Sequence, residues 1–226
     1  MMQISDLKHP IFQNTLKQIA TIAGLIHRYG WAEANAGNLS IDVTETVKQH
    51  MFTELNWFIV SRSGSRYRQT ALNPLENMML IACSDAEDNY FPEDAIPTSE
   101  WISHRCLQMQ HSNFKVILHT HPAEIIALSN LELGKDVNSL NSKLCELLPE
   151  LPLYLPEGVA IAPRAAPGSQ ELCELSLQTL ENRKALIWSG HGLLAFANDL
   201  DEALDYLEIV TKAARILLLN GSQKSS

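Results

Sequence analysis

A short apolar segment at 114–122 carries two histidines, and a third histidine lies between two glycines much later in the chain. Successive side chains of a β-strand point to opposite faces, so His119 and His121 are expected to project on the same side and bind one ion. Together with His191 they offer three imidazoles, with no Cys, Asp or Glu in the same motifs. Structural zinc sites fill all four positions, so this set predicts a catalytic Zn²⁺ site with one open position.

The alternative is that these histidines have no ligand role, because histidines are common on surfaces and in cores. The apolar residues Val116–Leu118 predict a buried strand, which Pro122 ends just after the pair. Imidazoles placed there would be costly to bury without a partner. Metal binding is therefore the favoured interpretation, although iron, cobalt or manganese could also occupy three imidazoles.

A metal with an open position can activate water, or it can polarise a carbonyl so that a neighbouring carbon loses or gains a proton. The second chemistry needs a separate carboxylate, and Glu100 is the candidate. It lies in the first turn of a helix expected from Pro97 to about Met109, with Thr98 or Ser99 as cap, where N–H groups could hold a phosphate.

Two other mechanisms fit the sequence less well. A Schiff base needs a desolvated lysine, and Lys115 is expected at the solvated start of the strand, roughly 13 Å from the histidine pair. A serine nucleophile at Ser189 lacks the G-x-S-x-G spacing of a nucleophile elbow. We also find no nucleotide-binding glycine loop.

The composition limits the architecture and the partners. With 226 residues and 46% hydrophobic content, the chain can bury one substantial core, so we expect a single domain over 1–220 and a disordered tail at 221–226. A net charge of −9 argues against a nucleic-acid partner. An anionic substrate would have to be held locally, by a metal, backbone N–H groups or a few arginines.

Neither a membrane span nor an export signal is expected. No run of about 18 uncharged apolar residues occurs, and the first residues lack a basic segment followed by an apolar one. The four cysteines are widely spaced, with no CxxC pair, and are expected to be reduced. These features predict a cytoplasmic protein.

Hydrophobic periodicity predicts an α/β fold. Apolar residues recur at helical spacing in 10–29, 169–183 and 199–219, the first ending at Gly30. Buried strands are expected at 57–60, 78–83, 114–119, 159–162, 185–188 and 193–196, whereas 132–152 is ambiguous. Several strand links are too short for helical crossovers, so we predict a three-layer α/β/α domain with a mainly antiparallel central sheet.

An ordered set of motifs now carries a family resemblance. The set comprises Asn35–Ser40, Ser63-Gly64, Pro97–Glu100, His119-Thr120-His121 and Gly190-His191-Gly192, within 10–219. It is similar to the class II aldolase and pentose-phosphate epimerase family, which includes adducin-like proteins, and above all to its rhamnulose-phosphate branch. The resemblance implies zinc-dependent retro-aldol cleavage of L-rhamnulose 1-phosphate to dihydroxyacetone phosphate and L-lactaldehyde, by a homotetramer with active sites between subunits.

The same resemblance assigns residue roles. It implies that His119, His121 and His191 bind one zinc per subunit, that Glu100 is the acid/base carboxylate, and that Glu150 reaches into a neighbouring subunit's site. It also implies a set of residues that hold the phosphate and the dihydroxyacetone part of the substrate: Asn35, Gly37, Asn38, Ser63, Gly64, Thr98 and Ser99. Taken singly, each of these seven is more typical of an ordinary turn than of a substrate site.

The histidines alone leave several activities open. Fuculose-phosphate aldolase, ribulose-phosphate 4-epimerase and a sugar-phosphate dehydratase would need the same three ligands. A non-catalytic assembly protein of the adducin type could share the fold, but it would have little reason to keep three ligands and a carboxylate together. Metal content and release of dihydroxyacetone phosphate distinguish these alternatives.

Overall fold

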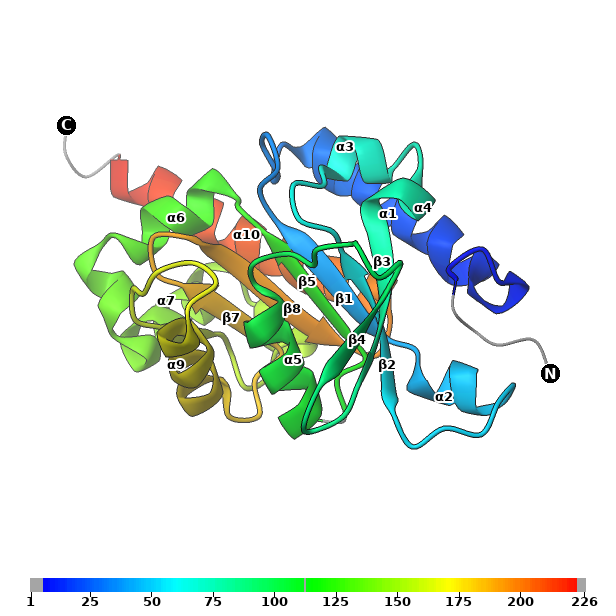
Figure 1. Ribbon diagram of the computed structural model, residues 1–226. Helices are drawn as coiled ribbons and strands as arrows, with labels where there is room; N and C mark the ends of the chain where they lie inside the picture. Colours follow the sequence, from blue (N-terminus) through cyan, green and yellow to red (C-terminus); the bar gives the residue numbers. More distant parts are fainter. Residues whose placement is uncertain (1–5, 112, 223–226) are drawn as a thin grey trace.

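The computed structural model describes residues 6–111 and 113–222, and a mixed sheet runs through its centre (Figure 1). The sheet has eight strands in the order β4-β3-β2-β1-β5-β8-β7-β6. All neighbouring pairs are antiparallel except β6 and β7, which are parallel, so the expectation of a mainly antiparallel sheet is confirmed. The strands are β1 (Asn38–Asp42), β2 (Asn56–Ser61), β3 (Met78–Cys83), β4 (Asp88–Phe91), β5 (Val116–Thr120), β6 (Ala160–Ala162), β7 (Ala185–Trp188) and β8 (Gly192–Ala197).

Helices connect and cover these strands (Figure 1). The first long helix ends at Gly30, whose φ of 72° is the left-handed conformation that glycine adopts without strain, as the sequence predicted. The helical segments are η1 (Pro10–Phe12), α1 (Gln13–Tyr29), α2 (Thr44–Lys48), α3 (Tyr67–Thr70), α4 (Pro74–Asn77), α5 (Trp101–Gln110), α6 (Ala123–Ser129), η2 (Glu132–Lys135), α7 (Val137–Leu147), α8 (Leu151–Tyr154), α9 (Gln170–Leu180) and α10 (Leu200–Ser222).

Apolar side chains alternate between the two faces of the sheet. On β5, Val116 and Leu118 belong to the core shared with α1, α6, α7 and α10, whereas Ile117 packs with α5 and α9. In Figure 1, α5 and α9 lie on the viewer's side of the sheet, and α10 lies behind it. Because side chains alternate, His119 shares the face of Ile117 and points toward α5 and α9.

The strand register brings distant segments to one end of the sheet. Asn38 on β1 lies opposite His119 on β5, which in turn lies opposite Leu194 on β8. The turn between β7 and β8 carries His191, so this histidine lies beside the end of β5. Long-range pairing of β5 with β8 therefore brings His191 to His119 and His121, which are already neighbours in the sequence.

Three local expectations differ from the structure. The segment 132–152, which the sequence left ambiguous, forms η2 and α7 and the start of α8. The last helix, α10, runs to Ser222 rather than to 219. The expected tail at 221–226 is thus partly helical, and its last four residues lie outside the described part. Glu100 is itself the N-cap residue of α5 rather than part of its first turn, and no side chain caps that helix.

Among the described residues, no helix is both long and apolar enough to cross a bilayer.

Candidate metal centre and active site

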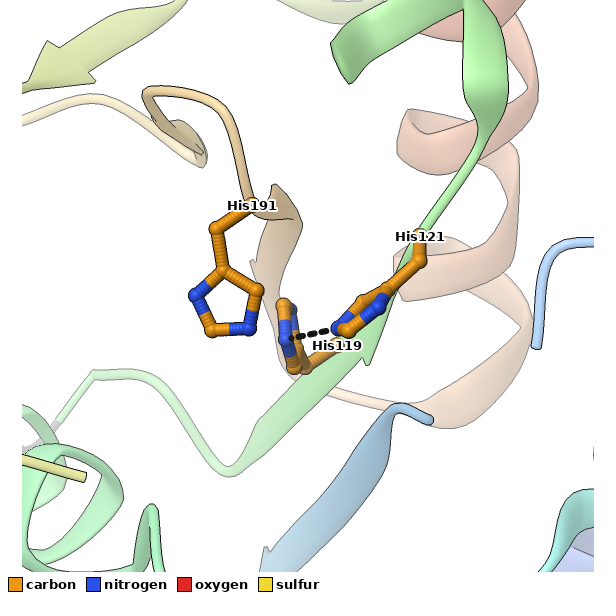
Figure 2. Close-up of side chains that lie close together, drawn as sticks. All are labelled: His119, His121 and His191. Carbon is orange, nitrogen blue, oxygen red and sulfur yellow. Dashed lines mark hydrogen bonds between the residues drawn. The ribbon is translucent and has the colours of Figure 1, made fainter. Parts of the chain in front are cut away.

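The three predicted ligands converge at the end of β5 (Figure 2). One ring nitrogen from each of His119, His121 and His191 lies within 4.8 Å of the others, and the Nε2 atoms of His119 and His121 are 2.9 Å apart. His119 and His121 project on the same side, as their spacing in the sequence predicted, although His121 lies one residue beyond β5. Three imidazole nitrogens at this spacing are a donor set that zinc and similar cations bind.

The surroundings of His119 fix which nitrogen is available. Its Nδ1 lies 3.1 Å from the carbonyl oxygen of Leu193, which can only accept, so Nδ1 carries the proton and Nε2 is unprotonated, with its lone pair toward the other two rings. A hydrogen bond to a backbone carbonyl is a common way to orient a metal-binding imidazole. Burial lowers the pKa of His119 to about 4 and that of His121 to about 3, so both rings are neutral near pH 7, as metal binding requires.

Glu100 lies beside these rings with only 5% of its surface exposed. Its Oε2 is 3.4 Å from His119 Nε2, and its Oε1 is 3.2 Å from His191 Nε2. The Asn38 amide donates to Oε2 at 2.6 Å. Burial alone would raise the pKa of this carboxyl, but His119 and the hydrogen bonds from His191 and Asn38 more than offset burial and lower the pKa.

A cavity of about 340 Å³ opens onto this cluster. Its lining contains all seven residues that the sequence analysis assigned to phosphate and substrate binding, together with Glu100, His121 and His191. His119 lies beneath it and is fully buried. Segments at 35–38, 63–64, 98–100 and 191 are far apart in the chain, so their convergence on one cavity is a property of the fold.

Gly37 allows the chain to pass close to β5. Its φ is +74°, and a Cβ there would lie 2.6 Å from the carbonyl oxygen of His119 and 2.9 Å from the Tyr67 ring. The Tyr67 hydroxyl lies 2.8 Å from the carbonyl oxygen of Asn38 and 3.1 Å from that of His119. A glycine and a buried tyrosine thus hold the backbone of the cavity wall against the histidine strand.

Several residues of this site were not predicted from the sequence. Arg62, Ser65 and Pro167 also line the cavity, and Tyr67 supports it from below. The segment after β2 is rich in hydroxyl and arginine side chains, which marked it as polar but did not indicate which of them face the cavity. Pro167 lies in a loop remote from every motif, and no local signal could have found it.

Glu150 lies apart from the histidines in this chain. It is the exposed N-cap residue of α8, its Oε2 is 3.4 Å from Lys212 Nζ, and it lines a different cavity with Leu153, Tyr154 and Asp205. A single copy therefore does not bring Glu150 to the metal centre. Its expected role requires a second copy of the chain.

Comparisons with known proteins agree with this geometry. Residues 17–218 match the model of the family described as Class II Aldolase and Adducin N-terminal domain. The chain belongs to this family. Within it, the rhamnulose-1-phosphate aldolase of Bacteroides thetaiotaomicron is 30% identical, covering 92% of this chain and 87% of that protein. The corresponding protein of Listeria welshimeri is 28% identical over 90% of this chain and 82% of its own length.

Solved structures agree as well. A sugar-phosphate aldolase from Thermotoga maritima superposes with a TM-score of 0.81 at 27% identity, over 93% of this chain and 96% of that one. An L-fuculose 1-phosphate aldolase gives a TM-score of 0.71 at 19% identity, over 93% and 87% of the two chains, which shows the shared fold alone. Family and relatives together identify the chain as an enzyme, a lyase of the class II aldolase type.

Proposed function

We propose that this enzyme cleaves L-rhamnulose 1-phosphate to dihydroxyacetone phosphate and L-lactaldehyde with the help of one bound zinc ion per subunit, in rhamnose catabolism. The observation that carries the proposal is the convergence of three imidazole nitrogens and the Glu100 carboxylate on one cavity lined by hydroxyl, amide and glycine residues. The curated relatives named above as rhamnulose-1-phosphate aldolases support the choice of substrate.

The metal fits the residues that would hold it. His119 presents an unprotonated Nε2, and its neighbours supply two further imidazole nitrogens within 4.8 Å. A divalent cation bound there supplies Lewis-acid stabilisation of the negative charge that develops on substrate oxygens when the carbon–carbon bond breaks. The three histidines fix where the ion would lie. Because their rings are neutral, their nitrogen lone pairs are available to bind it.

Glu100 moves the proton in this proposal. In a retro-aldol reaction the bond between two carbons breaks, one carbon becomes an aldehyde and the other must gain a proton. The Glu100 carboxylate is the acid/base group beside the cluster, and the Asn38 amide holds it from one side. We propose that the Glu100 carboxylate takes up the proton that the substrate hydroxyl loses as the aldehyde forms, and returns it to the carbon of the dihydroxyacetone phosphate half.

The seven cavity residues named earlier would hold the phosphate and the dihydroxyacetone part. Hydroxyls, amides and backbone N–H groups bind phosphate without a basic surface, which suits a chain of net charge −9. The phosphate would lie against Ser63, Gly64, Thr98 and Ser99, while Asn38 would lie nearer the reacting carbons, since it contacts Glu100.

We further propose that the enzyme is a cytoplasmic homotetramer in which Glu150 of one copy completes the site of the next. Leu153 and Tyr154 support an interface beside Glu150, because they expose 80% and 46% of their surface. Exposed apolar side chains of this kind often mark a contact between copies.

The decisive experiment pairs an assay with metal analysis. The purified protein is incubated separately with L-rhamnulose 1-phosphate, L-fuculose 1-phosphate and L-ribulose 5-phosphate, and release of dihydroxyacetone phosphate is measured. We expect release from the first substrate and about one zinc per chain. Release only from the second, or interconversion of the third without cleavage, would replace the proposed substrate. A metal-free and inactive protein would favour the adducin-like alternative.

A further inference from the structure

A second polar cluster, the brace, lies beneath Glu100 and is formed by Ser40, His104 and Gln108. Ser40 Oγ is 2.8 Å from His104 Nδ1 and 2.7 Å from Gln108 Oε1. Gln108 Nε2 donates to the carbonyl oxygen of Lys115 at 3.1 Å. Ser40 and His104 are fully buried, and Gln108 exposes 4% of its surface. The brace therefore links β1, α5 and the start of β5 away from solvent.

The direction of each hydrogen bond follows from the acceptors. The Lys115 carbonyl can only accept, so Gln108 presents Nε2 to it and turns Oε1 toward Ser40. Oε1 can also only accept, so the single Ser40 proton points to Gln108. His104 Nδ1 must then donate to Ser40 Oγ, which leaves Nε2 without a proton. Burial lowers the pKa of His104 to about 4, which is consistent with this neutral form near pH 7.

The brace is continuous with the carboxylate. The backbone N–H of His104 donates to the carbonyl oxygen of Glu100 at 3.1 Å, and its ring holds Ser40. Ser40 lies two residues after Asn38 on β1, on the same face, and the Asn38 amide donates to Glu100 Oε2. Glu100, His104, Ser40 and Asn38 thus form a closed ring between α5 and β1, made of three hydrogen bonds and the β1 backbone that joins Asn38 to Ser40.

The stability of the fold does not by itself explain why polar residues occupy this buried contact between α5 and β1. His104 Nε2 is one of the buried side-chain atoms without a hydrogen-bond partner in the described part of the chain. An unpaired buried acceptor destabilises the fold, whereas apolar residues of similar shape would pack at this contact without that penalty. What the brace provides is a fixed distance between the first turn of α5 and β1.

We propose that His104, supported by Ser40 and Gln108, is a positioning residue that holds Glu100 beside Asn38 and the histidine cluster. The inference rests on the proposed function, because the position of Glu100 affects turnover only if Glu100 transfers the proton. His104 is not placed against the substrate; its ring acts through Ser40 and β1, the strand that carries Asn38.

The kinetic test compares two replacements of His104. Asn places an amide nitrogen where Nδ1 lies, so His104→Asn keeps the donor to Ser40, whereas His104→Leu removes it at similar volume. We expect His104→Leu to lower kcat by about 30- to 100-fold with KM changed less than about twofold, because proton transfer is sensitive to misplacement. His104→Asn is expected to retain kcat within about threefold. Ser40→Ala is expected to resemble His104→Leu, and the double variant is expected to be no worse than either single variant.

Thr44→Val is the matched control. The Thr44 hydroxyl is buried and accepts the Trp57 backbone N–H at 2.9 Å, but it lies on α2, outside the ring around Glu100. We expect a comparable loss of stability with an unchanged kcat. A fall in kcat of the same size in Thr44→Val, or wild-type kcat in folded His104→Leu, would overturn the proposal.

A second measurement does not depend on activity. Nitrogen-15 NMR of the wild-type ring distinguishes the two neutral tautomers, and we expect His104 to carry its proton on Nδ1. A proton on Nε2, or a charged ring near pH 7, would overturn the brace even in an active enzyme. If rhamnulose 1-phosphate is not cleaved but the tautomer is as expected, the proposed substrate is wrong and the brace remains. The His104→Leu comparison is then made with the sugar phosphate that the enzyme does turn over. It can also be made by measuring proton exchange into dihydroxyacetone phosphate.

Discussion

Glu100 is the residue on which the proposed chemistry depends, and its environment keeps it charged although it is buried. We expect Glu100→Gln to lower kcat by about 10²- to 10⁴-fold, because the amide retains the shape of the carboxyl group but cannot carry the proton. The three imidazoles are unchanged, so metal content is expected to stay close to that of the wild type. Turnover by steady-state assay and zinc by elemental analysis check this. Wild-type turnover in the variant would exclude Glu100 as the acid/base group.

Glu150 tests the expected contribution of a neighbouring subunit. We expect Glu150→Ala to lower turnover while zinc content and stability stay unchanged, because an exposed ion pair such as that with Lys212 contributes only about 0–1 kcal/mol. The matched control is Glu146→Ala, another exposed glutamate, whose Oε1 lies 2.8 Å from Lys143 Nζ. Unaltered turnover in Glu150→Ala would remove this residue from the mechanism.

The start of β8 is the element that limits the space around the ligands. A Cβ at Gly192 would lie 2.5 Å from the carbonyl oxygen of Thr120 and 2.9 Å from ring carbons of both His119 and His121. Gly192→Ala is therefore expected to displace the imidazoles and weaken metal affinity by about 10- to 100-fold, measured by competition with a chelator. Gly24→Ala is the control, since its nearest neighbour, the Ala71 Cβ, would be 3.7 Å away. Equal metal affinity in both variants would contradict this role of Gly192.

Strands that are continuous apolar runs were predicted well. The strand at 78–83 and the strand at 185–188 have the expected bounds, because each is a continuous apolar run ended by polar or turn residues. β4 was not predicted, since Asp88–Phe91 is a short, mostly polar edge strand that resembles a surface turn. The parallel pairing of β6 with β7 was also missed, because a strand of three residues gives no signal for its direction.

The residues of the candidate site were likewise predicted only in part. Strand parity placed His119 and His121 together, the need for a carboxylate beside the metal pointed to Glu100, and the family resemblance supplied the cavity residues. The brace was not predicted, because Ser40 and His104 lie 64 positions apart and, although Ser40 ends one of the motifs, His104 lies outside all of them. Such contacts depend on how α5 packs on β1, which sequence periodicity does not specify.

At the scale of the whole molecule, buried neutral imidazoles link stability to pH. Burial lowers the pKa of His104 and His119 to about 4 and that of His121 to about 3, below the ordinary value of 6.5. Between these values the unfolded chain binds more protons than the folded one, so the free energy of unfolding rises with pH in this window and falls as pH drops. The maximum slope is about 1.4 kcal/mol per pH unit for each histidine.

This linkage predicts how metal and protons compete. In chelator-treated protein we expect the free energy of unfolding, from urea titration, to fall by at least about 2 kcal/mol between about pH 7 and about pH 5, a range above the ordinary carboxyl pKa values. Added zinc is expected to stabilise the protein more at the higher pH, because the ligands must lose protons to bind it. His104→Asn removes one buried ring that is not a metal ligand, so it should reduce the slope without changing the zinc effect. A metal-free stability that is flat over this range would mean that the rings are hydrated or already charged in the folded protein, and the neutral donor set inferred for the metal would then be wrong.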